Sequence, residues 1–160
     1  MVEIIIGDLL EATEKYIVHQ TNCVSQGGAA GLAFYLFKKF PYADVYANRE
    51  KPDAPGTSII SGNGKDQRYV INLMGQYYPG SFIEDSTNDN EESRKTYFHH
   101  ALIRLARISD METVAFPYKI GCGIAGGNWK WYLGTINNFA DFVKEKHGTK
   151  VVIYQREGDV

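Results

Sequence analysis

A chain of 160 residues, with 44% hydrophobic and 22% charged side chains, has the size and composition of one globular domain. Its formal net charge of -2 gives no electrostatic support for binding nucleic acid or an acidic membrane surface. The two cysteines form no CxxC pair, and no segment has the roughly 20 apolar residues of a membrane span. We therefore expect a single cytoplasmic domain over residues 1–160 that carries no metal and no cofactor.

Six short apolar runs, each bounded by Gly, Pro or Asn, are predicted to form strands. They cover residues 2–6, 16–20, 57–60, 69–73, 113–116 and 151–154. Apolar residues at the spacing of an amphipathic helix lie between them, over residues 33–40, 98–105 and 129–143. Asn88, Asp89 and Asn90 offer N-caps for the second helix, and Gly148 is a C-terminal signal for the third. Strands that alternate with helices predict an α/β fold, a three-layer α/β/α sandwich with a mixed central sheet of about six strands.

Two glycine-rich stretches each lead from a predicted strand into a predicted helix. The first follows Asn22 and contains Gly27, Gly28 and Gly31, and the second runs over residues 121–127. Glycine lets backbone N–H groups converge on an anion, and the N-terminus of the following helix adds a favourable dipole. Two such loops at the carboxyl ends of the strands would hold a diphosphate and its sugar without any lysine, which agrees with the weak net charge. The alternative is that these glycines only permit tight strand-to-helix turns.

Three other phosphate or nucleotide sites are disfavoured. Residues 121–126 read G-x-G-x-x-G, but a dinucleotide-binding dehydrogenase has this motif in its first βαβ unit, and here only one helix and one strand follow it. No G-x-x-x-x-G-K-[ST] sequence is present, so a P-loop is not expected. Ala29 and Asn128 stand where a C-x5-R phosphate cradle needs arginine.

Three segments, in this order along the chain, resemble those of macro domains. They are Gly7-Asp8-Leu9, then His19-Gln20-Thr21-Asn22-Cys23 with the following glycines, then the stretch Ile120-Gly121-Cys122-Gly123-Ile124-Ala125-Gly126-Gly127-Asn128-Trp129. The H-Q-x-N-C and I-G-C-G forms are similar to the branch that contains ADP-ribose 1″-phosphate phosphatases and ADP-ribosyl-ester hydrolases. The resemblance spans nearly the whole chain.

This resemblance implies that the ligand is ADP-ribose or a derivative. Asp8, with Leu9 beside it, would accept a hydrogen bond from the adenine amino group, and Tyr154 would pack against the adenine. The second glycine-rich loop would wrap the diphosphate, and Asn22 would touch the distal ribose, with the first loop on its other side. The implied ligand-binding residues are Asp8, Leu9, Asn22, Gly27, Gly28, Gly31, Gly121, Cys122, Gly123, Ile124, Ala125, Gly126, Gly127 and Tyr154.

The expected reaction is hydrolysis of ADP-ribose 1″-phosphate, with Asn22, His19 and Asp89 as the candidate catalytic residues. Asn22 would orient a ribose hydroxyl or the attacking water, or its side chain would only cap the turn. His19 is a candidate for proton transfer or a core histidine, and in a regular strand it would point away from the side of Asn22. Asp89 is a candidate general base, although helix capping explains it equally well.

Two alternative functions stay open at this stage. One is a module that binds ADP-ribose without turnover, and the other is a hydrolase that removes ADP-ribose from modified protein or nucleic acid. Ester hydrolases with a lysine nucleophile carry an acidic residue where Ala125 stands, and residues 74–80 contain no lysine. A covalent lysine mechanism is therefore disfavoured, and Cys23 and Cys122 are assigned no chemistry.

Overall fold

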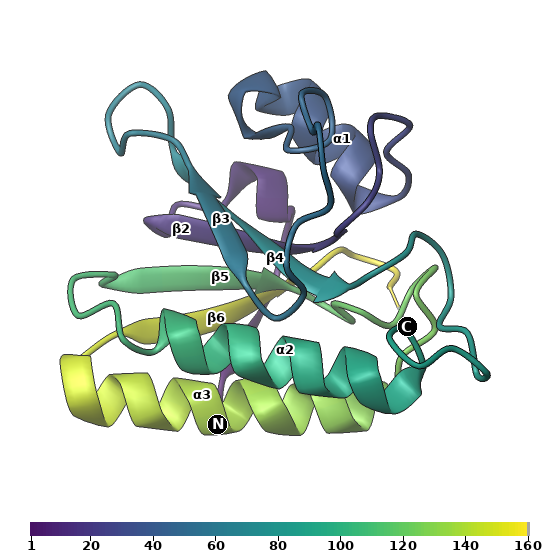
Figure 1. Cartoon of the computed structure of the whole chain (residues 1–160). Coiled ribbons are helices and arrows are strands. Elements are labelled where there is room, and N and C mark those ends of the chain that lie inside the picture. Colours follow the sequence, from purple (N-terminus) through teal and green to yellow (C-terminus); the bar gives the residue numbers. More distant parts are fainter. Residues whose placement is uncertain (160) are drawn as a thin grey trace.

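The computed structural model describes residues 1–159 and has a six-stranded sheet between two layers of helices (Figure 1). The strand order is β1-β6-β5-β2-β4-β3, and β3 alone pairs antiparallel with its neighbour. The predicted three-layer sandwich with a mixed sheet is confirmed. The strands are β1 (Glu3–Ile6), β2 (Tyr16–Asn22), β3 (Ser58–Ser61), β4 (Tyr69–Gln76), β5 (Thr113–Pro117) and β6 (Lys150–Gln155).

The central strands are apolar along their length because helices cover both faces of the sheet. On one face, Ile17 of β2 and Val70 of β4 pack in a core with α1 (Leu32–Lys39). On the other face, Val18 and Ile71 pack in a second core with the two longer helices. Successive strand residues thus serve opposite cores, as the alternation of side chains along a strand requires.

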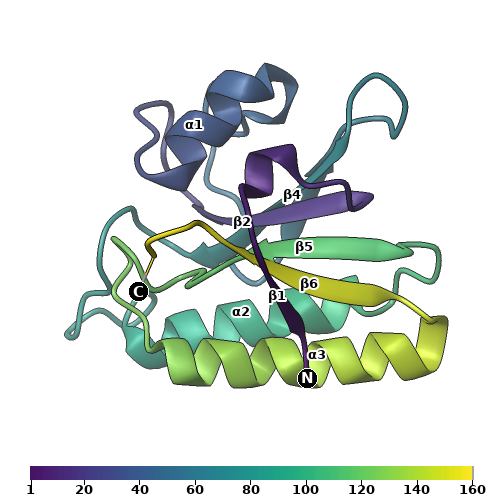
Figure 2. The same cartoon turned by 180° about the vertical axis from the view of Figure 1, so that it is seen from behind.

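The helices occupy the two sides that the strand pattern leaves apolar. Helix α1 lies on one side with the short 3₁₀ helices η1 (Leu9–Glu11) and η2 (Pro41–Ala43). Helices α2 (Glu91–Leu105) and α3 (Trp129–His147) lie side by side on the other, as the front and rear views show (Figures 1 and 2). Of the helices in residues 1–159, none is both long and apolar enough to cross a membrane.

The predicted helix signals act where expected, with one distinction among the candidate caps. Asn90 is the N-cap of α2, because its side chain accepts a hydrogen bond of 2.8 Å from the Ser93 N–H. Helix α3 ends at Gly148, whose φ of 72° is left-handed and suits glycine. Asp89 is therefore free of the capping role and has a different one, described below.

The order of the strands places the two glycine-rich loops next to each other. Strands β2 and β5 are parallel neighbours, so their carboxyl ends meet at the same edge of the sheet. The chain leaves β2 toward α1 on one side and leaves β5 toward α3 on the other. Such a reversal opens a crevice between the two connections, where α/β proteins bind ligands.

Candidate functional site

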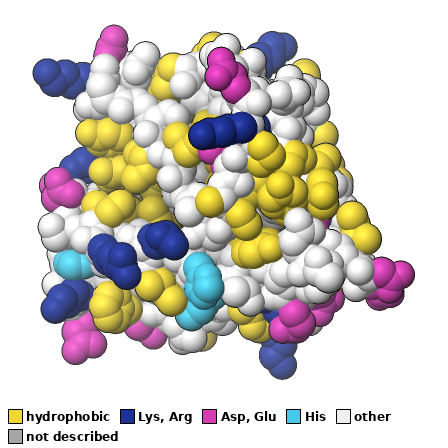
Figure 3. Space-filling model, in the orientation of Figure 1, with side chains coloured by type: hydrophobic (Ala, Val, Ile, Leu, Met, Phe, Trp, Pro, Cys, Tyr) yellow, Lys and Arg dark blue, Asp and Glu magenta, His cyan; other side chains and the backbone are white. Residues whose placement is uncertain are grey.

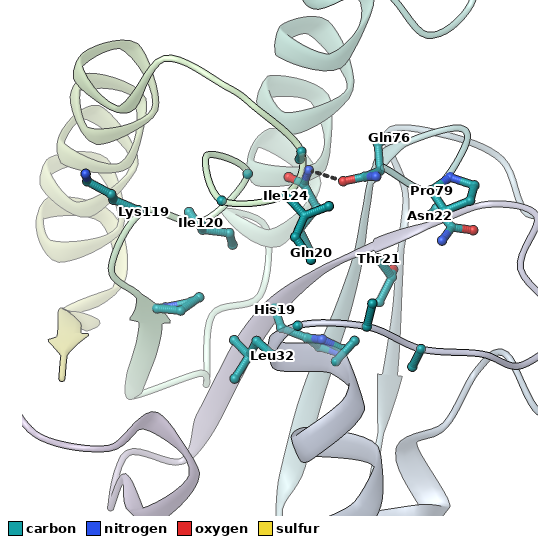
Figure 4. A pocket seen from close by; sticks show the side chains of 18 of the residues that line it. His19, Gln20, Thr21, Asn22, Leu32, Gln76, Pro79, Lys119, Ile120 and Ile124 are labelled. Atoms are coloured by element: carbon teal, nitrogen blue, oxygen red, sulfur yellow. Dashed lines mark hydrogen bonds between the residues drawn. The ribbon is translucent and has the colours of Figure 1, made fainter. Parts of the chain in front are cut away.

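A cavity of about 620 Å³ occupies this crevice, beyond the carboxyl ends of β2, β4 and β5 (Figure 4). Side chains from the end of β2 form its floor, and the two glycine-rich loops form opposite walls. A Cβ built on Gly31 would lie 3.3 Å from the Ile124 Cδ1 atom, so the loops approach each other closely. The sequence-predicted residues that line the cavity are His19, Asn22, Gly28, Gly31, Gly121, Gly123, Ile124 and Ala125.

The remaining predicted residues lie outside this lining. Asp8 follows the end of β1, and Tyr154 lies on the neighbouring strand β6. Gly7, which precedes Asp8, packs close to Tyr154, because a Cβ at Gly7 would lie 3.3 Å from the Tyr154 ring. The Asp8 carboxylate is exposed and accepts a hydrogen bond of 2.9 Å from the Leu10 N–H. Leu9 is buried in the core on the α1 side. The others outside the lining are Gly27, Asp89, Cys122, Gly126 and Gly127.

Asn22 lines the cavity and also holds the turn that begins the first loop. Its Oδ1 atom accepts hydrogen bonds from the Val24 N–H at 3.0 Å and from the Ser25 N–H at 2.8 Å. Its Nδ2 atom donates to the Ser25 Oγ at 2.9 Å and to the Tyr46 hydroxyl at 3.2 Å. Asn22 therefore has the turn-capping role that the sequence offered as the alternative, and it lines the cavity; its role toward a ribose stays a prediction.

His19 lines the same cavity, and so do Gln20 and Thr21, which lie between it and Asn22 on β2. The register between β2 and β4 shifts between Thr21 and Asn22 because β4 has one extra residue, Gly75, at that point. His19 is 1% exposed, and its ring packs edge-on against Phe37 of α1. His19 and Asn22 thus line one cavity, although alternation along a strand was expected to point them to opposite sides.

The protonation state of His19 follows from its neighbour Asn72. Its Nε2 atom lies 2.6 Å from the Asn72 Oδ1 atom, while the Asn72 Nδ2 atom donates to the Ile59 carbonyl and the Ser61 Oγ. The amide orientation of Asn72 is therefore fixed, and His19 Nε2 must carry the proton. The His19 Nδ1 atom is then an acceptor, and it has no partner among the described residues. Burial lowers the pKa of His19 to about 4, so the ring is neutral at pH 7.

The second glycine-rich loop is tightly packed at its two ends. A Cβ on Gly121 would lie 2.8 Å from the Tyr132 ring, and a Cβ on Gly127 would lie 2.5 Å from the Gly121 carbonyl oxygen. The Gly127 N–H also donates to that carbonyl at 2.9 Å. The Ser81 hydroxyl donates to the Ile124 carbonyl at 3.0 Å. Close backbone approach is therefore the reason for glycine at both ends of this loop.

Asp89 forms a buried ion pair that supports the loops around the cavity. It is fully buried, and its carboxylate accepts hydrogen bonds from Arg94 at 2.7 and 2.9 Å and from the N–H groups of Tyr77 and Tyr78. Arg94 in turn donates to the carbonyls of Gly80 at 2.8 Å and Ala125 at 3.3 Å. With every lone pair engaged away from the cavity, the geometry favours a supporting role for Asp89 over the proton transfer expected from the sequence.

A pair of glutamines at the site was not anticipated from the sequence. Gln20 donates from Nε2 to the Gln76 Oε1 atom at 2.8 Å, as the dashed line in Figure 4 marks, and Gln76 donates to the Tyr78 carbonyl at 2.8 Å. The Gln20 Oε1 atom is buried without a hydrogen-bond partner among residues 1–159. It lies 2.4 Å and 3.1 Å from where Gly75 and Gly121 would carry a Cβ. Gln20 ends one predicted strand and Gln76 lies beyond the end of another, so the sequence carried no signal for their pairing.

Few charges face the cavity. Of the described residues that line it, Lys119 is the one Lys or Arg and Asp159 the one Asp or Glu, and the Lys119 Nζ atom lies 5.8 Å from the centre of the Tyr118 ring. Burial raises the pKa of the Cys23 thiol to about 12 and of the Cys122 thiol to about 11. Residues 1–159 bring no three His, Cys, Asp or Glu side chains together as a metal-binding group. Backbone amides and neutral side chains therefore dominate the site.

Comparisons with known proteins identify the fold. No family model matches the sequence, and a search of curated proteins gives no match. The macrodomain of Mycobacterium tuberculosis DarG is similar, with a TM-score of 0.70 and 21% identity over 96% of this chain and 97% of that one. The macrodomain of Thermus aquaticus DarG has a TM-score of 0.69 and 23% identity over 97% and 98%. A mutant Oceanobacillus iheyensis macrodomain with ADPR has a TM-score of 0.54 and 16% identity over 96% and 83%. The fold expected from the sequence resemblance is thus confirmed, and this chain has the fold of a macrodomain.

Proposed function

We propose that this chain binds ADP-ribose in the cavity between its glycine-rich loops and, in the cytoplasm, hydrolyses ADP-ribose 1″-phosphate to ADP-ribose and phosphate. The observation that carries the proposal is the approach of the two loops over one cavity at the carboxyl ends of β2 and β5. Backbone N–H groups and a helix N-terminus bind a diphosphate without a cluster of basic side chains. The scarcity of charged residues in the lining agrees with that mode of binding.

The proposed ligand extends along the edge of the sheet. Adenine lies near Asp8 and Tyr154, which are neighbours at the ends of β1 and β6. The diphosphate lies against residues 121–127, and the distal ribose lies between Asn22 and the first loop. The solved structure of an Oceanobacillus iheyensis macrodomain with ADPR supports this choice of ligand, because the two folds are similar.

The proposed reaction is attack of water on the 1″-phosphorus. The bond between phosphorus and the ribose oxygen breaks, and that oxygen keeps the electron pair and takes a proton. Asn22 positions the distal ribose, and the unprotonated Nδ1 atom of His19 accepts a hydrogen bond from the water or from a ribose hydroxyl. Backbone N–H groups of the loops stabilise the charge that develops on the phosphate. Fixing the diphosphate supplies the orientation that such a step requires.

Binding of ADP-ribose without turnover is the second candidate function. The low pKa of His19 makes its ring a weak base, and Asp89 is fully engaged by Arg94 and by backbone N–H groups. A general base with a pKa near the working pH is the usual requirement for efficient proton transfer. The absence of such a base among His19 and Asp89 is the observation that supports a reader module as the second candidate.

The test compares phosphate release from ADP-ribose 1″-phosphate by the native chain, by Asn22→Ala and by Asn48→Ala. Asn48 is exposed and does not line the cavity, so it is the matched control. We expect about a hundredfold loss of release in Asn22→Ala alone, because misplacing the reacting ribose costs that much. Calorimetry with ADP-ribose is run in parallel.

The outcomes separate the two candidates. Binding of ADP-ribose with no phosphate release by the native chain would reject the phosphatase and leave a reader module or a hydrolase that removes ADP-ribose from modified protein or nucleic acid. Absence of both binding and release from a folded native chain would reject both functions. Release that Asn22→Ala leaves unchanged would keep the phosphatase and remove Asn22 from it.

A further inference from the structure

A second hollow lies on the outer surface of the helical layer formed by α2 and α3. It has a volume of about 820 Å³ and shares no lining residue with the cavity at the strand ends. Both helices connect parallel strands, so they run in the same direction and their C-terminal ends lie together (Figure 1). The groove is lined by His99, Leu102, Ile103, Ala106, Arg107, Trp131, Thr135, Asn138, Phe139, Phe142, Lys146 and His147.

The middle of this groove is apolar and partly open to solvent. Phe142 of α3 is 53% exposed, and Ile103 of α2 is 44% exposed. Leu102 and Phe139 are buried beneath them and belong to the core. Exposed large apolar side chains that gather over a groove, rather than being scattered singly, are typical of a protein-binding surface.

Two cations, Arg107 and Lys146, line the groove near the C-terminal ends of the two helices. No Asp or Glu lines it. Neither Arg107 nor Lys146 forms an ion pair within residues 1–159. Figure 3 shows basic and histidine side chains gathered with hydrophobic ones over this part of the surface, toward the lower left. In a chain with a net charge of -2, this concentration of unpaired cations is a local exception.

The opposite end of the helix pair differs. There Lys95 lies 3.5 Å from Glu91 and 3.4 Å from Glu92, so carboxylates of its own helix neutralise it. Its Nζ atom also lies 5.6 Å from the centre of the Trp131 ring. The two ends of the groove therefore differ in charge. Both are apolar, but the cation at the N-terminal end of the helices is paired with carboxylates, whereas those at the C-terminal end are not.

We propose that this groove binds an amphipathic, acidic peptide segment of a partner protein. Apolar side chains of the segment pack on Ile103 and Phe142, and its carboxylates pair with Arg107 and Lys146. Helix-in-groove recognition uses this combination of an apolar stripe and a charged margin. A second copy of this chain is the alternative occupant, and a twofold contact with the two grooves parallel is disfavoured because it brings the cations of one copy against those of the other.

The test uses the whole chain and a fluorescein-labelled synthetic peptide with leucine at positions i, i+3, i+4 and i+7 and glutamate elsewhere. The same peptide with lysine in place of glutamate is the charge control. Fluorescence anisotropy should show binding of the acidic peptide alone, with an affinity that falls as salt is added. Phe142→Ala and the double variant Arg107→Glu, Lys146→Glu should each weaken binding about tenfold or more.

Two matched variants complete the design. Arg104→Glu changes an exposed cation of α2 that does not line the groove, and Ile4→Ala removes an exposed apolar side chain of β1. Both should leave peptide affinity unchanged, and circular dichroism should show that every variant is folded. Equal binding of the two peptides, or unchanged affinity in the double variant, would overturn the proposal. A dimer in sedimentation velocity that Phe142→Ala dissociates would overturn it in favour of a second copy.

Discussion

The two glycine-rich loops face the same cavity, yet the protein holds them in different ways. Gly121 and Gly127 of the second loop are pressed against Tyr132 and against each other, and Arg94 binds the Ala125 carbonyl of that loop. Gly27 and Gly28 of the first loop have no atom within 4 Å of the place where a side chain would begin. The second loop is thus shaped before any ligand arrives, whereas glycines of the first leave space that a ligand can fill.

The largest expected effect comes from removing the support of the second loop. Arg94→Ala leaves the buried Asp89 carboxylate without its cation, so we expect a loss of about 3–5 kcal/mol in the free energy of unfolding. Urea denaturation measures it. Arg104→Ala, an exposed arginine of the same helix, should change stability by less than about 0.5 kcal/mol. Equal stabilities of the two variants would show that the second loop does not depend on this ion pair.

Lowering the pH should destabilise the folded protein through His19, which lies on β2, the strand that leads into the first loop. The folded pKa of His19 is about 4 and its ordinary value is 6.5, so the unfolded chain takes up the proton first as the pH falls. The contribution of neutral His19 to the free energy of unfolding is therefore fully present above pH 6.5, and it decreases as the pH falls from 6.5 toward 4. The loss is about 3 kcal/mol over that window. Urea denaturation across this range should show a shallower dependence in His19→Gln, and identical slopes would contradict the assignment.

Gly127→Ala tests whether the second loop is as closely packed as its contacts indicate. The new methyl group would lie 2.5 Å from the Gly121 carbonyl oxygen, so we expect a destabilisation of about 1–3 kcal/mol in thermal or urea unfolding. Gly134→Ala in α3 is the control, because no atom lies within 4 Å of its Cβ position. That substitution should stabilise the helix by up to about 1 kcal/mol.

Gly28→Ala makes the same change in the first loop and should have the smallest effect on stability. The cost of about 1 kcal/mol comes from a φ of +65°, since no neighbouring atom obstructs the methyl group. Calorimetry should nevertheless show weaker ADP-ribose binding, because the methyl group enters the space assigned to the ligand. Gly148→Ala has a comparable φ of +72° at the end of α3, away from the cavity, and should lose similar stability with unchanged affinity. Unchanged affinity in both variants would place the ligand elsewhere.

Much of the fold could be predicted because its signals are local. The apolar runs located all six strands to within a few residues at their ends, and the helical spacings located the three α-helices, with the start of α2 marked by its cap and not by its apolar spacing. Gly148 marked the end of α3, and the two 3₁₀ helices were not predicted. Strand β4 continues to Gln76, beyond the predicted residue 73, because its last polar side chain is satisfied inside the protein. A polar residue that has a buried partner looks, in the sequence, like the end of a strand.

The part of the candidate site that could be predicted from the sequence is the part formed by the glycine-rich loops and the strand ends before them. The positions of Asn22 and of the two loops at the cavity followed from strand ends and glycine spacing. The Gln20–Gln76 pair joins residues 56 positions apart and depends on the register of β2 with β4, including its shift after Thr21. The engagement of Asp89 by Arg94 likewise depends on how α2 packs against the loops. Such pairings arise from tertiary packing and leave no periodic pattern.

The two cysteines offer a way to watch each loop separately. Cys23 lies just before the first loop and Cys122 lies within the second, and burial raises the pKa of both thiols well above neutrality. Because the thiolate is the form that alkylating reagents attack, modification of the fully buried Cys23 requires a local opening that exposes its sulfur, whereas Cys122 is partly exposed in the folded chain. The rates at which the two thiols are alkylated, read in one sample by mass spectrometry, therefore report separately on the two walls of the cavity.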